Sequence, residues 1–519
     1  MKDPFLMNGM DLAVERILSA IEKGERIMVY GDYDVDGTTG VSLFYLFLIK
    51  VYDNIEFYIP DRYTEGYGVS KLGIDTANDN GCKLIVAIDC GIRSVELVNY
   101  AHSLNIDFII CDHHLPGKTL PEAVAVLDPK KNECTYPFKE LSGCGIALKL
   151  SQALNQNSTF WPDDYFLEFV DLAAVSTCCD IVPMVGENRI LVQFGLDKLN
   201  TAPRLGLKTL LYGADNQAHQ PLSVTDIVFK IGPRINAAGR IKSARSAVEL
   251  LISDDFELAK EYSAALNELN TQRGALDSSI TEEAFNLIRK EKDYDNKFTT
   301  VVYSPLWHKG VVGIVASRLI EKFYRPTLVL TDADEYIGGS ARSIDKVDVH
   351  EALTLCADLL SQFGGHSHAA GLKLKPENLE AFKQRFDEAV STMITREDLK
   401  PIYWYETEWG IELVNEKLLE NIQRFSPFGP QNMEPVFLAK GVYDTGLGRT
   451  MGKDHDHLRL NLVSAKRNDP ITAIGFKLGQ HYTKINSGKP FNMLYTVGLN
   501  YFNGQSSLQL EIKDIKFEA

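Results

Sequence analysis

The sequence predicts an α/β protein with a parallel-sheet domain, a second α/β domain reached through a long helix, and a C-terminal β-barrel. Between Glu25 and about Val185, short apolar runs alternate with amphipathic stretches, which is typical of βαβ units. The alternation returns over 299–375. After Lys400, short strand candidates are separated by Asn, Gly and Asp, which indicates a small barrel. We expect a first domain at 1–190, a helical connector at 191–295, an α/β domain at 296–398 and a barrel at 399–519.

The composition is that of an ordinary soluble protein. Of 519 residues, 45% are apolar and 24% are charged, and no stretch approaches the length of a membrane span. The N-terminal segment has no basic patch followed by an apolar core, so we expect no secretory signal. The eight cysteines are scattered, as is typical of reduced thiols without a disulfide or zinc framework. These features favour a cytoplasmic protein without membrane contact.

The net charge of −16 does not by itself favour a nucleic-acid partner. A local basic channel can nevertheless bind a polyanion, because net charge governs solubility and the long-range field. Residues 230–245, KIGPRINAAGRIKSAR, carry five basic side chains and no acidic one. Arg234, Arg240 and Lys242 are therefore candidates for phosphate contacts.

The stretch Ile27–Gly40, IMVYGDYDVDGTTG, has the pattern of a buried strand, an acidic turn and a helix. Parallel α/β folds present ligands at the carboxyl edge of the sheet, where this turn is expected. Asp32, Asp34 and Asp36 repel one another there, so a divalent metal ion is the expected counter-charge. The alternative is a solvated acidic turn.

Five further acidic or imidazole residues, in three segments, follow apolar stretches in the same way. Asp89 follows LIVAI, Asp112, His113 and His114 follow FIIC, and Asp180 ends the helical run FVDLAAVSTCC. Each alone could be a helix cap or a structural histidine. Their succession at strand and helix ends favours a metal site instead.

The second half of the chain contains two segments of less common pattern. Residues 254–292 form a long polar helical stretch that Gly274 interrupts, which favours a bridging helix over a coiled coil. The second α/β region contains IGGSARS and then a helix that ends in the glycine-rich sequence FGGHSHAAGLKL.

The motifs GDYDVDGTTG, AIDCG and CDHH, together with Asp180, resemble those of the DHH phosphoesterase family. The segments PRINAAGRI and GGHSHAAG and the β-rich tail resemble the RecJ-type exonucleases of that family, with their DHH-associated domain and oligonucleotide-binding (OB) barrel. The resemblance covers nearly the whole chain. It implies an exonuclease that degrades single-stranded DNA in the 5′→3′ direction to mononucleotides, in DNA repair and recombination. Relatives usually carry a further N-terminal segment before the stretch that begins here at residue 3.

The resemblance also implies roles for the acidic and imidazole residues. Asp34 and Asp89 would bind one ion, with Asp32 as a further ligand or anchor. The second ion would be bound by Asp36, Asp89, His113 and Asp180, with Asp89 bridging and catalytic. His114 would contact the scissile phosphate or protonate the leaving oxygen. Oxygen-rich ligation favours two Mn²⁺ or Mg²⁺ ions over zinc.

Substrate contacts follow from the same resemblance. Arg62, Arg342 and Ser343 resemble the family's contacts to a terminal 5′-phosphate, whereas a single arginine could equally form a surface ion pair. His366 or His368 would line the substrate channel unless GGHSHAAG is only a tight packing loop. In the barrel, base stacking is expected for some of four aromatic residues, although most of them, taken singly, would be core residues: Phe476, Tyr495, Tyr501 and Phe502.

The sequence is compatible with two other functions. A DHH phosphodiesterase could act on short oligonucleotides, cyclic dinucleotides or the nucleotide pAp, although such relatives are shorter and lack the barrel. A non-catalytic single-strand-binding scaffold is disfavoured because every metal motif is intact. Besides single-stranded DNA, the expected partners are a single-strand-binding protein and a RecQ-type helicase.

Overall fold

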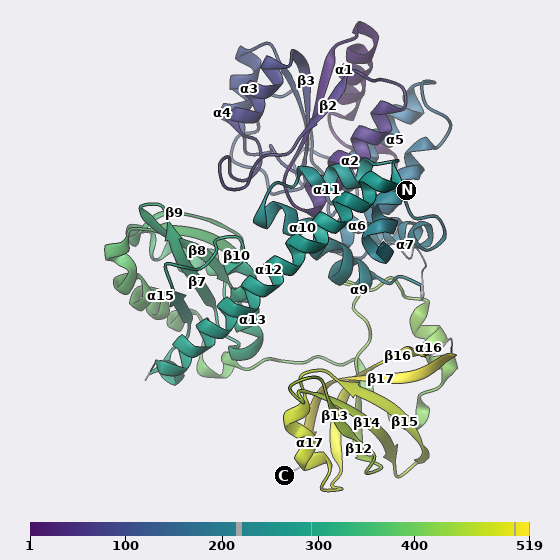
Figure 1. The fold of residues 1–519 in the computed structure, drawn as a ribbon, viewed down its shortest axis with the longest axis vertical. Helices are drawn as coiled ribbons and strands as arrows, with labels where there is room; N and C mark the ends of the chain where they lie inside the picture. Colours follow the sequence, from purple (N-terminus) through teal and green to yellow (C-terminus); the bar gives the residue numbers. More distant parts are fainter. Residues whose placement is uncertain (214–220, 292, 503–504, 518–519) are drawn as a thin grey trace.

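Figure 1 shows the computed structural model, which describes residues 1–213, 221–291, 293–502 and 505–517. A first α/β domain and a smaller second one lie at the two ends of the long helix α12 (Phe256–Lys290), and an extended segment leads from the second domain to a C-terminal barrel. The three regions have separate hydrophobic cores. None of the described helices is both long and apolar enough to cross a bilayer.

The first domain contains the predicted parallel sheet, with strand order β2-β1-β3-β4-β5. Its strands are β1 (Arg26–Gly31), β2 (Ile55–Tyr58), β3 (Cys82–Ile88), β4 (Asp107–Cys111) and β5 (Ala125–Leu127). The covering helices are α1 (Met10–Lys23), α2 (Val35–Ile49), α3 (Lys71–Asp79), α4 (Val95–Ser103), α5 (Gly143–Asn157) and α6 (Val170–Cys179), with the short turns η1 (Pro4–Leu6) and η2 (Tyr165–Phe169).

This strand order fixes the position of a ligand site. β2 lies on one side of β1 and β3 lies on the other, so the chain connections diverge between β1 and β3. In open α/β sheets, such a switch point leaves a crevice at the carboxyl ends of the strands. Asp32 follows β1 and Asp89 follows β3, which places both at this crevice.

The connector packs on the first domain rather than standing apart from it. Residues of α7 (Gly186–Thr201), α8 (Leu205–Tyr212), α11 (Arg245–Ile252) and the first turns of α12 share the first domain's core. The expected boundary at residue 190 thus falls inside α7. Between these helices lie α9 (Val224–Asp226), the π-helical turn η4 (Ile227–Ile231) and α10 (Gly232–Ile241).

The bridging helix is confirmed but its expected interruption is not. α12 runs unbroken through Gly274. A Cβ at position 274 would meet no atom within 4 Å, so the glycine faces open space. The intrinsic cost of one glycine, about 1 kcal/mol, is offset by packing along the rest of the helix.

The second domain has a mixed sheet of order β6-β7-β8-β10-β9, in which only β6 and β7 are parallel. The strands are β6 (Thr300–Tyr303), β7 (Thr327–Ala333), β8 (Tyr336–Arg342), β9 (Leu360–Gly365) and β10 (Ala369–Leu374). The helices are α13 (Val312–Phe323), α14 (Val349–Thr354) and α15 (Leu379–Met393), with the turns η5 (Tyr294–Asn296), η6 (Ala357–Leu359), η7 (Pro376–Asn378) and η8 (Arg396–Leu399).

The glycine-rich sequence of this domain is a β-hairpin, not the end of a helix. α14 stops at Thr354, and β9 and β10 pair antiparallel around His366–His368. Gly365, at φ +145°, lies so close to Ala370 that a Cβ would be 2.5 Å from its Cα. A side chain at this position would therefore disrupt the hairpin.

The C-terminal region is the predicted barrel, with strand order β11-β12-β16-β17-β15-β14-β13 and a further β12–β14 pairing. Its strands are β11 (Thr407–Glu408), β12 (Phe437–Asp444), β13 (Arg449–Met451), β14 (His457–Ser464), β15 (Arg467–Gly475), β16 (Phe491–Phe502) and β17 (Gln505–Phe517). It also contains α16 (Glu416–Gln423), α17 (Tyr482–Ile485) and the turns η9 (Ile411–Leu413) and η10 (Gly479–His481).

Candidate metal centre and adjoining arginine cavity

The three aspartates after β1 have different environments. Asp32 is buried, and one of its oxygens accepts a 3.1 Å hydrogen bond from Gly68 N. Asp34 is the N-cap of α2 and accepts from Gly37 N at 3.1 Å. Burial and the neighbouring carboxylates raise the pKa of both Asp32 and Asp34. A positive ion among them would relieve this cost.

Asp36 lies within the first turn of α2 and accepts hydrogen bonds from residues of two other helices, α5 and α6. Its two oxygens accept from Gly143 N at 2.6 Å and Cys144 N at 2.8 Å, at the N-terminus of α5, and from Ser176 Oγ at 2.5 Å. Donors at a helix N-terminus stabilise a carboxylate. Asp36 is therefore fixed in a single position by elements from three parts of the first domain.

Asp89 has a backbone that few non-glycine residues adopt, with φ +61°. This conformation directs its carboxylate into the crevice, toward α5. A Cβ on Gly143 would lie 2.6 Å from the Asp89 Cβ and 2.8 Å from its Cα. Glycine at 143 is thus required for α5 to approach Asp89 while its N–H binds Asp36.

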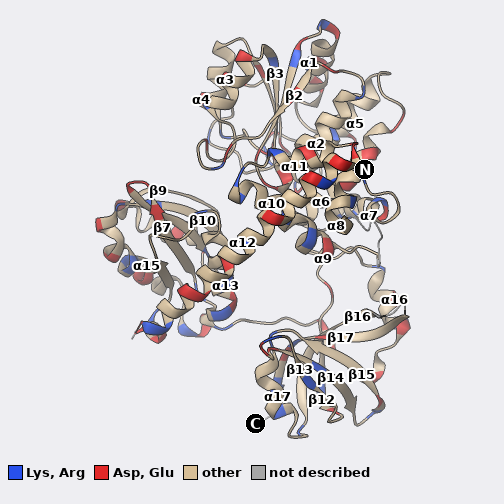
Figure 2. Cartoon of the chain, in the orientation of Figure 1, with Lys and Arg blue, Asp and Glu red and all other residues tan. Residues whose placement is uncertain are grey.

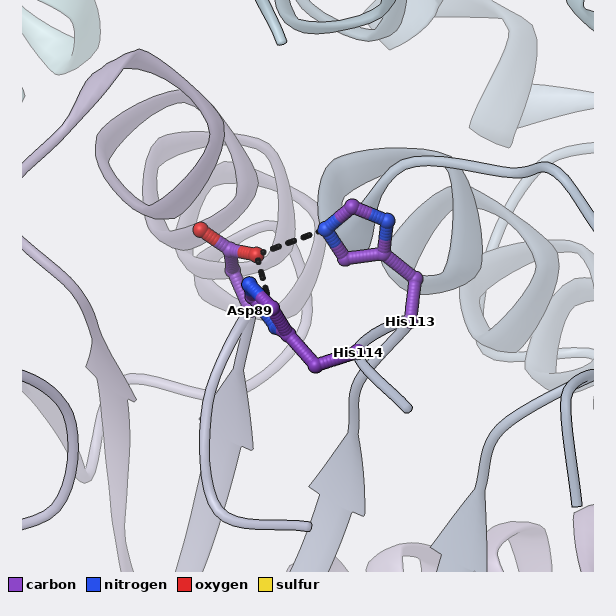
Figure 3. A group of neighbouring side chains, drawn as sticks. All are labelled: Asp89, His113 and His114. Atoms are coloured by element: carbon purple, nitrogen blue, oxygen red, sulfur yellow. Dashed lines mark ion pairs between the residues drawn. The ribbon is translucent and has the colours of Figure 1, made fainter. Parts of the chain in front are cut away.

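Two imidazoles flank the Asp89 carboxylate (Figure 3). Nε2 of His113 lies 3.2 Å from Asp89 Oδ1, and Nδ1 of His114 lies 3.9 Å from the same oxygen. Burial lowers the pKa of His113 to about 4, which keeps its ring neutral and able to act as a ligand.

His114 is positioned by two polar neighbours. Its Nδ1 lies 2.7 Å from Asp112 Oδ1, and its Nε2 lies 3.1 Å from the Tyr67 hydroxyl. Although burial opposes ionisation of both partners, their mutual contact raises the pKa of His114 and holds the pKa of Asp112 at about 2. Asp112 also accepts from the N–H groups of Ile92, His113 and His114, so it orders the loop that carries both histidines.

Asp180, the C-cap of α6, completes the centre. Its Oδ2 lies 3.5 Å from His113 Nε2, the same distance as Asp36 Oδ2. Burial and nearby carboxylates raise the pKa of Asp180 and Asp89. Two triads result, in each of which the ligand atoms lie within 4.8 Å of one another: Asp36, His113 and Asp180, and Asp89, His113 and His114.

These residues fit a divalent metal. Among the described residues, buried oxygens of Asp32 and Asp89 and both ring nitrogens of His113 have no hydrogen-bond partner. Unsatisfied buried polar atoms of this kind are costly, and metal binding would satisfy the carboxylate oxygens and Nε2 of His113, the ring nitrogen that faces them. A donor set of carboxylates with one or two imidazoles suits Mn²⁺ or Mg²⁺.

A cavity of about 1090 Å³ lies between the first domain, the connector and the second domain. The first domain contributes Arg62 and tyrosines, α10 contributes Arg240, and β8 contributes Arg342. Tyr67 lines this cavity and also contacts His114, so the cavity adjoins the acidic centre. Lys and Arg are otherwise spread over all parts of the chain, interspersed with Asp and Glu (Figure 2).

The arginines of the cavity are crowded. Burial and the charges of Arg62, Arg273 and Arg342 lower the pKa of Arg240 to about 10. Burial and the charge of Arg62 also lower the pKa of Arg342. Gathering like charges in a partly buried space is unfavourable unless an anion joins them, so the cavity is suited to a phosphate group.

Other residues singled out in the sequence lie outside the cavity lining. Arg234 donates to Leu210 O at 3.2 Å, and the Ser343 hydroxyl donates to Val347 O at 2.7 Å. Lys242 is the C-cap of α10. His366 and His368 are exposed in the turn of the hairpin, and His366 lies near enough to His114 to interact with its charge. The glycines and alanines beside these histidines do line the cavity.

Sequence reasoning missed the tyrosines Tyr33, Tyr63 and Tyr67 and a further arginine, Arg273. Arg62 stacks on Tyr33 at 5.0 Å, and the Tyr63 hydroxyl donates to Arg240 O. The dense Tyr and Arg content of IPDRYTEGYG was the available signal for two of the tyrosines. No local pattern distinguishes Arg273, because it lies in a polar helix of mixed charge.

The barrel aromatics divide by exposure. Tyr495 is buried in the barrel core and its hydroxyl donates to Trp409 O. It is therefore a core residue and is not available for base stacking. Phe476 and Tyr501 are exposed and remain candidates for stacking. The side chain of Phe502 lies outside the described residues.

Comparison with protein families identifies three segments. Residues 26–176 match the DHH family, N-terminal domain, residues 296–392 match the DHHA1 domain, and residues 405–514 match the RecJ OB domain. The three matched segments correspond to the first domain, the second domain and the barrel.

Individual relatives cover almost the whole chain. It is 34% identical over 526 residues to the single-stranded-DNA-specific exonuclease RecJ of Salmonella typhimurium, covering 98% of this chain and 90% of that protein. Identity to the protein of the same name from Bacillus subtilis is 38% over 514 residues; the match covers 99% of this chain but spans only 64% of that relative. The crystal structure of Thermus thermophilus RecJ in complex with Mn²⁺ superposes with a TM-score of 0.82 at 28% identity, covering 99% of this chain and 72% of that chain.

Proposed function

The chain belongs to the RecJ family of DHH proteins, and from this premise we propose that it degrades single-stranded DNA from the 5′ end to mononucleotides. The observation that carries the proposal is the contact between an acidic centre and an arginine cavity. Tyr67 touches His114 in the centre and lines the cavity, so a strand whose terminal phosphate occupies the cavity passes beside the carboxylates. Relatives named single-stranded-DNA-specific exonucleases support the choice of substrate.

In this proposal, Asp34 and Asp89 bind one divalent ion, with Asp32 as an anchor, and Asp36, Asp89, His113 and Asp180 bind the other. Ions of this kind supply a nucleophile at neutral pH and disperse the charge of the phosphoryl group. The Mn²⁺- and Mg²⁺-bound RecJ structures from Thermus thermophilus support this choice of metals. The chain's own contribution is a rigid donor set, since α5 fixes Asp36 and Gly143 allows α5 to approach Asp89.

His114 acts on the substrate side of the centre. Asp112 and Tyr67 orient its ring, so one nitrogen can donate to a phosphate oxygen or to the leaving oxygen. Its neighbour His113 faces the carboxylates instead. The two adjacent histidines therefore have separate roles.

The arginine cavity selects the end of the strand. Arg62, Arg240 and Arg342 bind the terminal 5′-phosphate, together with Ser343, which follows Arg342 in the chain. The hairpin glycines let backbone N–H groups approach the phosphate. Arg234, Lys242, His366 and His368 contact the backbone farther along the strand. These contacts do not read bases, which suits degradation of any sequence.

Several finer features belong to the same proposal. The protein acts in the cytoplasm in DNA repair and recombination, where a single-strand-binding protein and a RecQ-type helicase deliver its substrate. The barrel binds the strand outside the cavity and increases processivity.

The test is digestion of single- and double-stranded DNA labelled at either end, with Mn²⁺ present. We expect release of labelled mononucleotide from the 5′ end of single strands alone. Substrates with a 5′-hydroxyl should be cleaved more slowly than those with a 5′-phosphate, because the arginines lose their anion. Preference for dinucleotides or pAp over a long strand would replace this function with that of a small-substrate phosphodiesterase.

A further inference from the structure

An exposed run of aromatic residues lies in the segment between the second domain and the barrel. Ile402, Tyr403, Trp404 and Tyr405 are all exposed, and the exposed fraction of Trp404 is 83%. Four consecutive large apolar side chains in water are unusual for a soluble protein and mark a contact surface. We call residues 401–405 the aromatic strap.

The strap is fixed at both ends. Before it, Asp398 in η8 pairs with Lys346 of the second domain at 2.5 Å. After it, Glu406 N donates to Val436 O at 2.8 Å, and β11 joins the barrel sheet through β12. Between these anchors, the described structure gives no backbone hydrogen bond for 401–405. The strap crosses from the second domain to the barrel in Figure 1.

The strap and an exposed aromatic residue of the barrel both lie near the end of α13. Tyr403 lies near Tyr324, the C-cap of α13. Three residues earlier in α13, Glu321 pairs with Lys477 of the barrel at 2.8 Å. Lys477 follows Phe476, which is exposed and stacks edge-on with His457. The end of α13 therefore has the strap on one side, near Tyr324, and the Phe476 segment of the barrel on the other, through Glu321 and Lys477.

The chemistry of this surface favours nucleobases over a protein partner. The strap offers exposed ring faces on the segment that joins the second domain, whose β8 and hairpin line the arginine cavity, to the barrel that matches the RecJ OB domain. Stacking needs only a ring face and accepts every base. The neighbouring Lys346 and Lys477 are already paired with Asp398 and Glu321, so the surface provides stacking and little phosphate attraction.

We propose that the aromatic strap, with Trp404 at its centre, is a base-stacking site for the single strand on its way from the barrel to the catalytic cleft. The inference rests on the proposed function for the identity of the polymer, and it adds a binding site outside the acidic centre, the arginine cavity and the barrel. The site is independent of sequence and only weakly dependent on salt, because its contacts are made by neutral rings.

Trp404 provides its own reporter. Of the four tryptophans, Trp161 and Trp307 are buried and Trp409 is partly buried against the barrel core. A phosphorothioate-linked oligothymidylate of about 30 nucleotides, which resists cleavage and exceeds one barrel's site, is titrated against the full chain with Mg²⁺. We expect the long-wavelength tryptophan emission to be quenched, and Trp404→Phe to remove that component.

Affinity is then measured by anisotropy of the same labelled oligonucleotide. Stacking of one base on an aromatic ring contributes substantially to the free energy of binding, so Trp404→Ala should weaken binding about 5- to 50-fold. Trp404→Phe keeps a ring and should weaken binding by less than about threefold. Phe194→Ala, which removes an exposed ring from α7, is the matched control and should change the affinity less than twofold. The salt slope of the binding constant should be the same for Trp404→Ala as for the unchanged chain, since no phosphate contact is lost.

Hydrolysis separates this inference from the proposed function. Trp404→Ala should raise KM for a long strand and leave kcat/KM for a tetranucleotide unchanged. If Trp404→Ala binds the long oligonucleotide as tightly as the unchanged chain does, the inference is wrong, even where the unchanged chain is an active exonuclease. If the unchanged chain does not degrade single strands but binding still depends on Trp404, the proposed function fails and the stacking site stands.

Discussion

The acidic centre and the arginine cavity adjoin each other but are built in different ways. The centre comes from one domain: its side chains follow β1, β3 and β4 of a single parallel sheet or lie beside α5 and α6. The cavity is assembled from the first domain, α10 and the second domain. One sheet therefore fixes the centre, whereas contacts between domains, such as Arg240 Nη1 to Gly310 O at 3.0 Å, fix the cavity.

This difference predicts that substitutions in the centre affect chemistry and substitutions in the cavity affect binding. The largest effect is expected for Asp89→Asn, which keeps a residue that tolerates φ +61° but removes the charge. Hydrolysis with Mn²⁺ should fall by about 1000-fold or more, because the carboxylate between the two histidines is lost. Single-turnover cleavage of 5′-labelled DNA measures the rate.

Binding of the same DNA provides the contrast. Asp89→Asn should bind a single strand within about threefold of the unchanged chain, since the arginines are untouched. Turnover close to that of the unchanged chain would contradict the two-ion assignment. A parallel loss of binding would show that the centre and the cavity are not separable.

The next largest effect is expected for Arg240→Gln, which removes a cavity charge while keeping a polar side chain. KM for 5′-phosphorylated DNA should rise about 10- to 100-fold, because a hydrogen bond between charged groups contributes about 1.5–3 kcal/mol. kcat should change little. Arg245→Gln is the matched control from the same basic segment, since Arg245 pairs with Glu249 and does not line the cavity. An equal rise in KM for both variants would argue for general rather than local charge.

The contrast between a centre built on one sheet and a cavity assembled from several domains also explains how much of the site the sequence could predict. Asp89 and the aspartates after β1 lie at strand ends, where an apolar run followed by carboxylates indicates their place in the fold. Tyr33 contributes through its contact with Arg62, and Arg273 through its charge near Arg240. Both act between segments distant in the chain, for which periodicity holds no information. The sequence around His366 predicts a helix end because β9 is glycine-rich and its burial does not alternate; only β10 buries every second side chain.

A smaller effect tests how precisely the sheet fixes the centre. Gly143→Ala places a Cβ 2.6 Å from the Asp89 Cβ, so α5 must shift away from Asp89 and Asp36. Such overpacking costs about 1–3 kcal/mol of the free energy of unfolding, which urea denaturation measures. Activity should fall as well, because the Gly143 N–H no longer binds Asp36 in the same geometry.

Gly145→Ala, two residues farther along the first turn of α5, is the matched control. The nearest atom to its Cβ would be Ser142 Oγ at 3.4 Å, which is ordinary contact, and alanine favours a helix. Gly145→Ala should therefore leave activity unchanged. If Gly143→Ala behaved in the same way, the close approach of α5 would not matter for the centre.

The smallest effect concerns the barrel, whose placement depends on contacts of unequal strength. Lys477 pairs with Glu321 of the second domain through side chains that are largely exposed, whereas Arg189 of α7 donates to the carbonyls of Arg424 and Ser426. Exposed ion pairs contribute between zero and about 1 kcal/mol and are screened by salt. Lys477→Ala should therefore change processivity on long strands by less than about twofold, and not at all at high salt, while Arg189→Ala should reduce it more. A large loss of processivity in Lys477→Ala that persists at high salt would mean that this lysine binds the strand directly. The barrel, like the cavity, would then contribute a positive charge to substrate binding.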